Sequence, residues 1–266
     1  MGKEKSSALL PTPALQRRRP VRAEPGATQG LAADVVRPDP LYDQIYEILW
    51  QKILNLEITA GTRLRDIEWA EKLNVSRTPV REALRKLQKD GMLEALSNGR
   101  YVLKRIGSND LRALYRCRAA LEALAIRDLA GRITPREATK LQALVDETVG
   151  CLESKDYSSV FALHSEFHER LTQLCGNTYL LTLLETLRRL ILYARASLRT
   201  FVDADEALSE AYARQVETSQ VHHTRIMASI AARDFDGAAA QMETHLFETA
   251  EDMCQILDQV PVPDAK

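Results

Sequence analysis

The sequence predicts a mainly α-helical protein in which three helices and a small β-hairpin are followed by an all-α antiparallel helical bundle. Three observations lead to this prediction. Apolar residues recur at spacings of three and four over residues 41–91 and again beyond residue 107, the periodicity of helices that bury one face. Between these regions an Asn-Gly pair separates two short apolar runs, a strong signal for a tight hairpin. A chain of 266 residues with 45% hydrophobic content can form two modest cores.

Residues 1–38 are predicted to form a flexible basic tail. They contain several prolines, the cluster Arg17-Arg18-Arg19 and few large apolar side chains, so they cannot bury enough surface to offset the entropy lost on ordering. An unstructured extension without a specific role is the favoured interpretation, and extra nonspecific attraction to nucleic acid is the alternative. A second, short tail is expected at residues 259–266.

Three helices are expected after the tail. The first begins near Leu41, and Gly61 ends its segment. The second is short and opens at Asp66, whose carboxylate is placed to cap it. The third follows a tight turn at residues 74–76 and stops at Gly91, since glycine commonly ends a helix.

A β-hairpin is expected next. Residues 92–96 and 101–106 are short runs of extended pattern, and Ser97-Asn98-Gly99-Arg100 joins them. The central residues of such a turn need positive φ, which Asn and Gly tolerate. Three helices followed by a hairpin are the order of a winged helix-turn-helix, so residues 39–106 are predicted to be a DNA-binding domain.

The third helix carries the chemistry expected of an element that reads DNA. Arg77, Arg81 and Arg85 are each four apart, so they line one helix face, while apolar residues line another. Thr78 and Pro79 fix the helix start and leave early backbone N–H groups free to meet a phosphate. An arginine near the start of a helix in the major groove can donate two hydrogen bonds to guanine. A solvated face is the alternative, but the order of the surrounding elements favours DNA reading.

The charge distribution agrees with this interpretation. The net charge is only −1, but Lys and Arg outnumber Asp and Glu over residues 1–105 and are outnumbered in the remainder. A basic excess confined to one part of the chain is expected where only that part meets phosphate.

Residues 107–258 are predicted to be all helical. Ser108 or Asn109 is placed to cap the first helix of this part. About six or seven helices are expected, and the glycines that punctuate the later ones are Gly131, Gly150, Gly176 and Gly237.

Composition excludes several other classes of protein. No stretch approaches the roughly 18 to 20 uninterrupted apolar residues of a membrane helix, and the N-terminus has no compact apolar segment of the secretory type. A cytoplasmic protein without a membrane partner is therefore expected. The four cysteines are far apart, which argues against a zinc ribbon or a dithiol motif and for reduced core residues; they are Cys117, Cys151, Cys175 and Cys254.

The histidines suggest a metal site. All five lie in the helical part, and His164 and His168 are four apart, so that both imidazoles project from one helix face. His223 belongs to a later helix and His245 to the last. A bundle that brings these helices together would present up to four neutral imidazoles to one divalent ion. For each histidine taken alone, a packed or surface residue is the alternative.

Three motifs of the N-terminal part resemble the GntR family of bacterial repressors. They are Gly61-Thr-Arg-Leu, then Leu73-Asn-Val-Ser-Arg-Thr-Pro-Val-Arg-Glu-Ala-Leu-Arg-Lys-Leu, and Asp90-Gly-Met-Leu. The resemblance implies DNA contacts from the recognition helix and from the tip of the wing; the residues concerned are Arg77, Thr78, Arg81, Arg85, Gly99 and Arg100. Trp69 departs from the family, which usually has leucine there.

The region from about Asp110 onward resembles the ligand-sensing FCD domain of the FadR-type subgroup. The resemblance rests on Arg118-Ala-Ala-Leu-Glu122, on Phe167-His168 followed by Gly176-Asn177, and on the two later histidines. It implies that one metal is held by His164, His168, His223 and His245. The first of these replaces the family's aspartate, and an all-imidazole site favours zinc, nickel or copper over manganese; zinc is the first choice and nickel the second.

The resemblance also implies a small carboxylate effector that completes the coordination of the metal. Arg118 and Arg195 are candidate partners for the carboxylate, with surface arginines as the alternative. Asn177 is a third candidate for effector binding, and a role at a helix terminus is the alternative.

The function predicted from these features is a homodimeric transcription regulator, a repressor, that leaves double-stranded DNA when a small organic acid binds. Its operator should be a short inverted repeat, and residues 106–110 would act as the hinge. One alternative is the same regulator with a metal-free pocket for an acyl thioester or a sugar acid. Another is a metal-dependent hydrolase, against which stands the position of Glu166, two residues from both His164 and His168 and so on another helix face.

Overall fold

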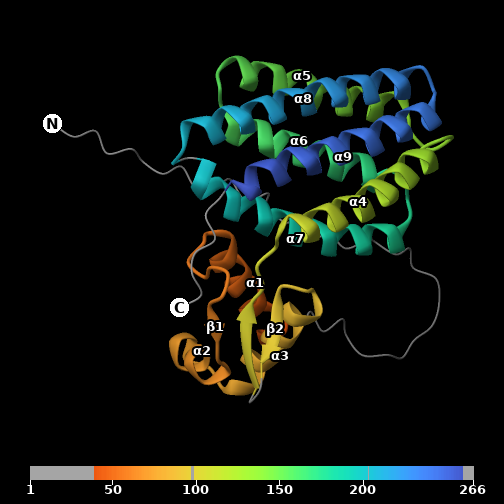
Figure 1. Cartoon of the computed structure of the whole chain (residues 1–266). Helices are drawn as coiled ribbons and strands as arrows, with labels where there is room; N and C mark the ends of the chain where they lie inside the picture. Colours follow the sequence, from red (N-terminus) through yellow and green to blue (C-terminus); the bar gives the residue numbers. More distant parts are fainter. Residues whose placement is uncertain (1–38, 97–98, 203, 260–266) are drawn as a thin grey trace, which may run out of the picture.

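The computed structural model describes residues 39–96, 99–202 and 204–259 (Figure 1). The predicted terminal tails, apart from Gln259, and the pair Ser97-Asn98 of the predicted turn lie outside the described residues. The described chain is mainly α-helical, with a small sheet in its N-terminal part and a helical bundle beyond it (Figure 1). The predicted fold class is confirmed.

The N-terminal part holds three helices and a three-stranded antiparallel sheet. Its described elements are α1 (Leu41–Leu54), β1 (Arg63–Leu64), α2 (Asp66–Leu73), α3 (Arg77–Lys89), β2 (Leu93–Leu96) and β3 (Arg100–Leu103). The strand order is β1-β3-β2, with Val102 opposite both Arg63 and Glu94. β2 and β3 form the predicted hairpin. β1 is an addition, because two residues are too few to show a strand periodicity.

The core of this part forms where the apolar stripes of α1 and α3 meet. Leu49 and Ile53 of α1 and Leu84 and Leu87 of α3 are all 0% exposed. Full burial of each such side chain contributes about 1.5–3 kcal/mol. One stripe of α3 is used in this way, so its opposite face remains available to a partner.

Two helix starts differ from the prediction. The N-cap of α2 is the residue before Asp66, and the Asp66 carboxylate turns toward α3 instead of capping α2. The N-cap of α4 is Gly107, whose N–H donates to the carboxylate of Asp110 at 3.2 Å. A carboxylate inside the first turn therefore takes the place of the predicted caps Ser108 and Asn109.

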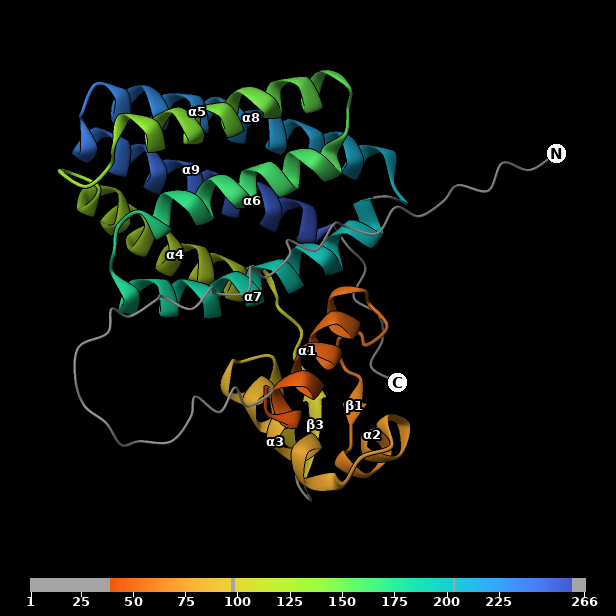
Figure 2. The same cartoon turned by 180° about the vertical axis from the view of Figure 1, so that it is seen from behind.

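The C-terminal part is a bundle of antiparallel helices (Figures 1 and 2). The helices described there are α4 (Ser108–Asp128), α5 (Pro135–Glu153), α6 (Tyr157–Gln173), α7 (Thr178–Val202), α8 (Glu206–Ala231) and α9 (Phe235–Asp258), within the predicted number. Gly150 and Gly237 lie inside α5 and α9 instead of between helices, each within a turn of a helix end. No described helix has both the length and the apolar content needed to cross a membrane.

The two parts are joined through α1 and α7, which lie side by side in both views (Figures 1 and 2). The Arg189 guanidinium of α7 lies over the rings of Tyr46 and Trp50, at 5.1 and 5.6 Å from their centres, and forms an ion pair with Glu47 at 3.2 Å. The predicted hinge at residues 106–110 is thus accompanied by a second connection that involves side chains of both parts.

Candidate DNA-reading helix and candidate metal centre

α3 presents one apolar and one cationic face, in agreement with the spacing of its arginines. Arg77, Thr78, Arg81 and Arg85 are all exposed, and so are Glu82, Lys86, Gln88 and Lys89. The helix begins at Arg77, and the side chain of its N-cap Ser76 makes no hydrogen bond to the first turn. First-turn N–H groups without a side-chain acceptor can bind a phosphate. The start and the exposed face of α3 therefore offer donors for both phosphates and base edges.

Asp66 of α2 holds two of these arginines. Its carboxylate accepts a hydrogen bond from Nη2 of Arg77 at 3.1 Å and from Nε and Nη2 of Arg81 at 3.1 and 2.7 Å. Burial raises the pKa of Asp66, but the hydrogen bonds from Arg81 and Arg77 outweigh burial and lower it. An ionised carboxylate thus fixes two guanidinium groups at the start of α3.

Gly99 and Arg100 are exposed at the hairpin between β2 and β3. Gly99 has φ +69°, and no described atom lies within 4 Å of a Cβ built there. Backbone conformation, not crowding, therefore favours glycine. Arg100 pairs with Leu96 across the hairpin. The hairpin extends away from the bundle (Figure 1), which leaves these predicted wing residues accessible.

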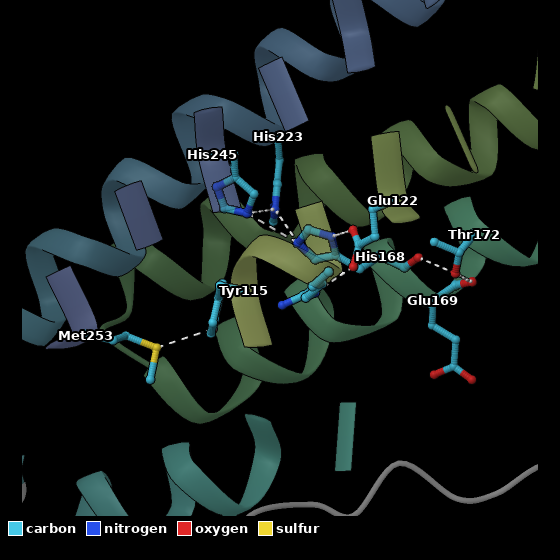
Figure 3. A network of polar contacts seen from close by, with 9 residues as sticks. Tyr115, Glu122, His168, Glu169, Thr172, His223, His245 and Met253 are labelled. Carbon is cyan, nitrogen blue, oxygen red and sulfur yellow. Dashed lines mark hydrogen bonds and ion pairs between the residues drawn. The ribbon is translucent and has the colours of Figure 1, made fainter. Parts of the chain in front are cut away.

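Three imidazoles from three helices converge in the bundle (Figure 3). The Nε2 atoms of His168 on α6, His223 on α8 and His245 on α9 lie 3.1, 3.2 and 3.3 Å apart, and all three side chains are buried. Zn–N bonds of about 2.0–2.1 Å in a tetrahedral site place ligand nitrogens about 3.3–3.4 Å apart. The spacing therefore fits one metal ion bound at all three nitrogens.

The protonation of these rings also fits a metal. Burial lowers the pKa of both His223 and His245 well below the ordinary value, so the rings are neutral, as metal ligands must be. Each neutral Nε2 carries either a hydrogen or a lone pair. Among three such nitrogens, at least one contacting pair therefore places two hydrogens or two lone pairs against each other. A cation that accepts all three lone pairs removes this conflict.

Glu122 of α4 orients the first of these ligands. Its Oε2 lies 2.5 Å from Nδ1 of His168, and its Oε1 accepts from Nε of Arg118 at 2.6 Å (Figure 3). Burial raises the pKa of Glu122, but Arg118 and His168 lower it to about 2. The carboxylate thus holds the hydrogen of His168 on Nδ1 and leaves the Nε2 lone pair for a metal, the arrangement in which carboxylates support metal-bound histidines.

His164 is not brought into this cluster, although it was one of the four predicted ligands. Its Nε2 lies 3.2 Å from Oε1 of Gln220, whose amide is held by the Val145 carbonyl at 2.7 Å. The ring is edge-on to His223 with centres 4.4 Å apart. The structure thus brings three of the four predicted ligands together and places His164 beside them, with its Nε2 on a buried amide of α8. The four-histidine set stays a prediction.

A cavity of about 440 Å³ opens beside the converging imidazoles and reaches His168, Arg118 and Arg195. The Arg195 guanidinium lies over the ring of Phe161 at 4.5 Å, and its buried Nε has no hydrogen-bond partner among the described residues. Both predicted effector-binding arginines thus line the same cavity. Arg118 is already paired with a carboxylate, whereas Arg195 interacts with Tyr115 and Tyr212 and keeps its Nε as a donor without a partner among the described residues.

Asn177 lies elsewhere. Its Oδ1 accepts from the backbone N–H of Leu180 at 3.1 Å, and it does not line the cavity. The structure thus gives it the alternative role, as the residue that caps the start of α7.

Comparison with known proteins gives matches to both parts of the chain. Residues 41–102 match the model of the bacterial regulatory proteins of the gntR family, and residues 113–248 match the FCD domain. The chain is 30% identical to the HTH-type transcriptional repressor RspR of Escherichia coli, over 82% of this chain and 90% of that protein. It is 27% identical to the uncharacterized HTH-type transcriptional regulator YdhC of Bacillus subtilis, over 84% and 95%.

Solved structures support the fold. E. coli McbR/YncC superposes with a TM-score of 0.62 at 22% identity, over 81% of this chain and 98% of that chain.

Proposed function

Because the chain belongs to the GntR family of bacterial regulatory proteins and carries an FCD domain, we propose that it is a homodimeric repressor that leaves its operator when a small organic acid binds beside a metal in the bundle. The family is one of transcription regulators, so the chain is not an enzyme and the hydrolase alternative is dropped. As a DNA-binding regulator of a bacterial type, it would act in the cytoplasm.

The observation that carries the proposal is the cavity that reaches His168, whose imidazole converges with two others. His168, His223 and His245 would hold the ion, and a bound divalent metal would supply a Lewis-acid position for a carboxylate. Arg195, with a buried and unpartnered Nε, would donate to the same carboxylate. A volume of about 440 Å³ lies within the range of small-molecule sites. A ligand set made only of imidazoles favours zinc, with nickel second.

The homodimer is proposed from the symmetry that DNA recognition requires. Two copies of α3 related by a twofold axis would read an inverted repeat. The bundle exposes large apolar side chains that a second copy could cover; among them are Leu124 and Phe247, at 43% and 44% exposure. Light scattering of the purified protein measures the subunit number directly.

The test of this function uses an operator selected from random duplexes. Metal-loaded protein is expected to enrich an inverted repeat, and at least one acid of a panel of acetate, lactate, malate and citrate should lower its affinity for that duplex. Chelator-treated protein should lose the response to acid and keep the binding to DNA, because the acid would act through the metal site. If an acid still releases the protein from the operator equally well after chelation, the proposed role of the metal is contradicted. DNA binding that no acid changes contradicts the proposed effector class.

Asp66→Asn is expected to reduce the preference for the operator over scrambled DNA by about tenfold, a loss within the range of one bidentate base contact. Removal of the carboxylate frees Arg77 and Arg81 from a fixed geometry but adds one unit of positive charge. Affinity for the operator should therefore fall, while affinity for scrambled DNA rises slightly. Asp66→Glu, which keeps the charge, is the matched variant. An unchanged ratio for Asp66→Asn would show that the carboxylate has no part in positioning the arginines.

A further inference from the structure

The cavity beside the imidazoles is not enclosed by the bundle alone. Part of its wall comes from α1 of the DNA-binding part, through Trp50, Gln51 and Leu54. Along α7 the lining extends from Leu181 to Arg195, about four turns or 21 Å of helix. Figure 2 shows α6 and α1 on either side of α7. We call this cavity the α7 groove.

Different regions of the α7 groove differ in charge and polarity. One region is cationic and next to His168, since Arg118 and Arg195 line it and the Glu122 carboxylate, which pairs with Arg118, offsets only one of the two charges. The remaining wall has an apolar part, formed by Trp50, Leu54, Leu181, Leu184, Ile191 and Leu192, and a charged part, formed by Glu169, Glu185, Arg188 and Arg189. The volume of about 440 Å³ is about fifteen times the share of one water molecule in the liquid. The smallest organic acids would occupy the cationic region and leave most of the apolar wall uncovered.

The helix that contributes this wall also supports the DNA-reading helix. The hydroxyl of Tyr46 on α1 donates to the Asp90 carboxylate at 2.6 Å, and Asp43 pairs with Lys86 of α3 at 2.7 Å. A ligand in contact with Trp50 therefore touches the same helix that packs against α3. Its binding free energy then depends on how the DNA-binding part is placed on the bundle, the condition for coupling between two sites.

We propose that the effector is an organic acid with an apolar extension, and that it fills the α7 groove so that the extension contacts Trp50 and Leu54 of the DNA-binding part. The inference rests on the proposed metal-and-acid site, which binds the carboxylate. It adds the class of acid and a direct contact between ligand and DNA-binding part.

The test titrates full-length metal-loaded protein with straight-chain carboxylates from acetate to decanoate. Calorimetry on the unaltered protein is expected to show affinity that rises by up to about fourfold for each methylene buried, until the groove is filled. The chain has two tryptophans, so Trp69→Phe leaves Trp50 as the sole indole, and its emission should shift with the longer acids. Leu54→Ala should lower the affinity for decanoate about tenfold and leave the affinity for acetate unchanged. The matched control is Leu183→Ala on the exposed side of α7, which should change neither.

The outcomes separate the two proposals. If acids bind with an affinity independent of chain length, or if Leu54→Ala matches Leu183→Ala, the extension does not reach α1 and the inference is overturned while the metal-and-acid site stands. If no acid of the series binds, or if binding is unaffected by both chelation and Arg195→Ala, the metal-and-acid site itself fails and the inference with it.

Discussion

Protein purified without chelator is expected to contain about one transition-metal ion per chain, and the His223→Ala variant is expected to contain none. His223 lies within 3.1 and 3.2 Å of the other two ligand nitrogens, so its removal leaves two imidazoles from two helices. Two such ligands hold a divalent ion far less tightly than three. Elemental analysis of the purified proteins measures the metal content and identifies the metal.

Two neighbouring histidines serve as controls for this experiment. His222 is adjacent in sequence, but its Nε2 pairs with Glu248 of α9 at 2.8 Å, so His222→Ala should retain the metal. His164→Ala should also retain it, because the ring faces Gln220. Loss of metal in His164→Ala would support the four-histidine set that the sequence predicts. A metal-free parent protein would exclude the site.

Stability gives a second measurement of the same site. A ligand present at 100 times its dissociation constant stabilises the folded state by about 2.7 kcal/mol. For a chain of this size that corresponds to a rise in Tm of roughly 5–10 °C, at about 2–4 °C per kcal/mol. Chelation should therefore lower the Tm of the parent protein and leave that of His223→Ala unchanged.

The fold could largely be predicted because its signals are local. The stripe of leucines on α3 and the Asn-Gly turn each follow from residues within a few positions of one another. β1 could not be found in this way, because Arg63 and Leu64 become a strand only by pairing with β3. The cap of α4 depends on which nearby polar group reaches Gly107, and several candidates had the right chemistry.

The sequence predicted what kind of site each one is, but not all of the contacts that position its residues. His164 and His168 share a helix face, and that spacing is visible in the sequence. Which of the two turns toward the metal ligands depends on Gln220, which is 56 residues from His164. The role of Glu122 was missed for the same reason, since its contact with His168 spans 46 residues. The spacing of four between Arg118 and Glu122 was the only local sign that this carboxylate is held in place.

The Asp66 contacts show the same limit within the DNA-binding part. The sequence places Asp66 where it could cap α2, and a cap is a local feature. Its actual partners are 11 and 15 residues away, across the turn between α2 and α3. The angle between these two helices brings them together, and no spacing rule encodes that angle. Arg77 and Arg81 are therefore not free side chains but members of a preorganised network.

Arg81→Ala is expected to weaken binding to the selected operator by about 5- to 150-fold, the range that corresponds to loss of one bidentate base contact of about 1–3 kcal/mol. Arg81 is exposed near the start of α3, and its guanidinium is oriented by Asp66 through two hydrogen bonds. A fixed planar guanidinium loses little conformational entropy when it pairs with guanine. Fluorescence anisotropy with labelled operator and scrambled duplexes measures the loss, and Arg214→Ala, an exposed arginine of α8, should bind both duplexes as the parent does.

Arg81→Lys decides between base reading and phosphate binding. Lysine keeps the positive charge but cannot reproduce the bidentate geometry. If Arg81 reads a base, Arg81→Lys should bind the operator nearly as weakly as Arg81→Ala, and both should leave the affinity for scrambled DNA close to that of the parent. If it binds only a phosphate, Arg81→Lys should retain most of the affinity, and Arg81→Ala should weaken all duplexes alike and reduce the salt dependence by about one ion. Operator binding by Arg81→Ala as tight as that of the parent would remove Arg81 from the DNA interface.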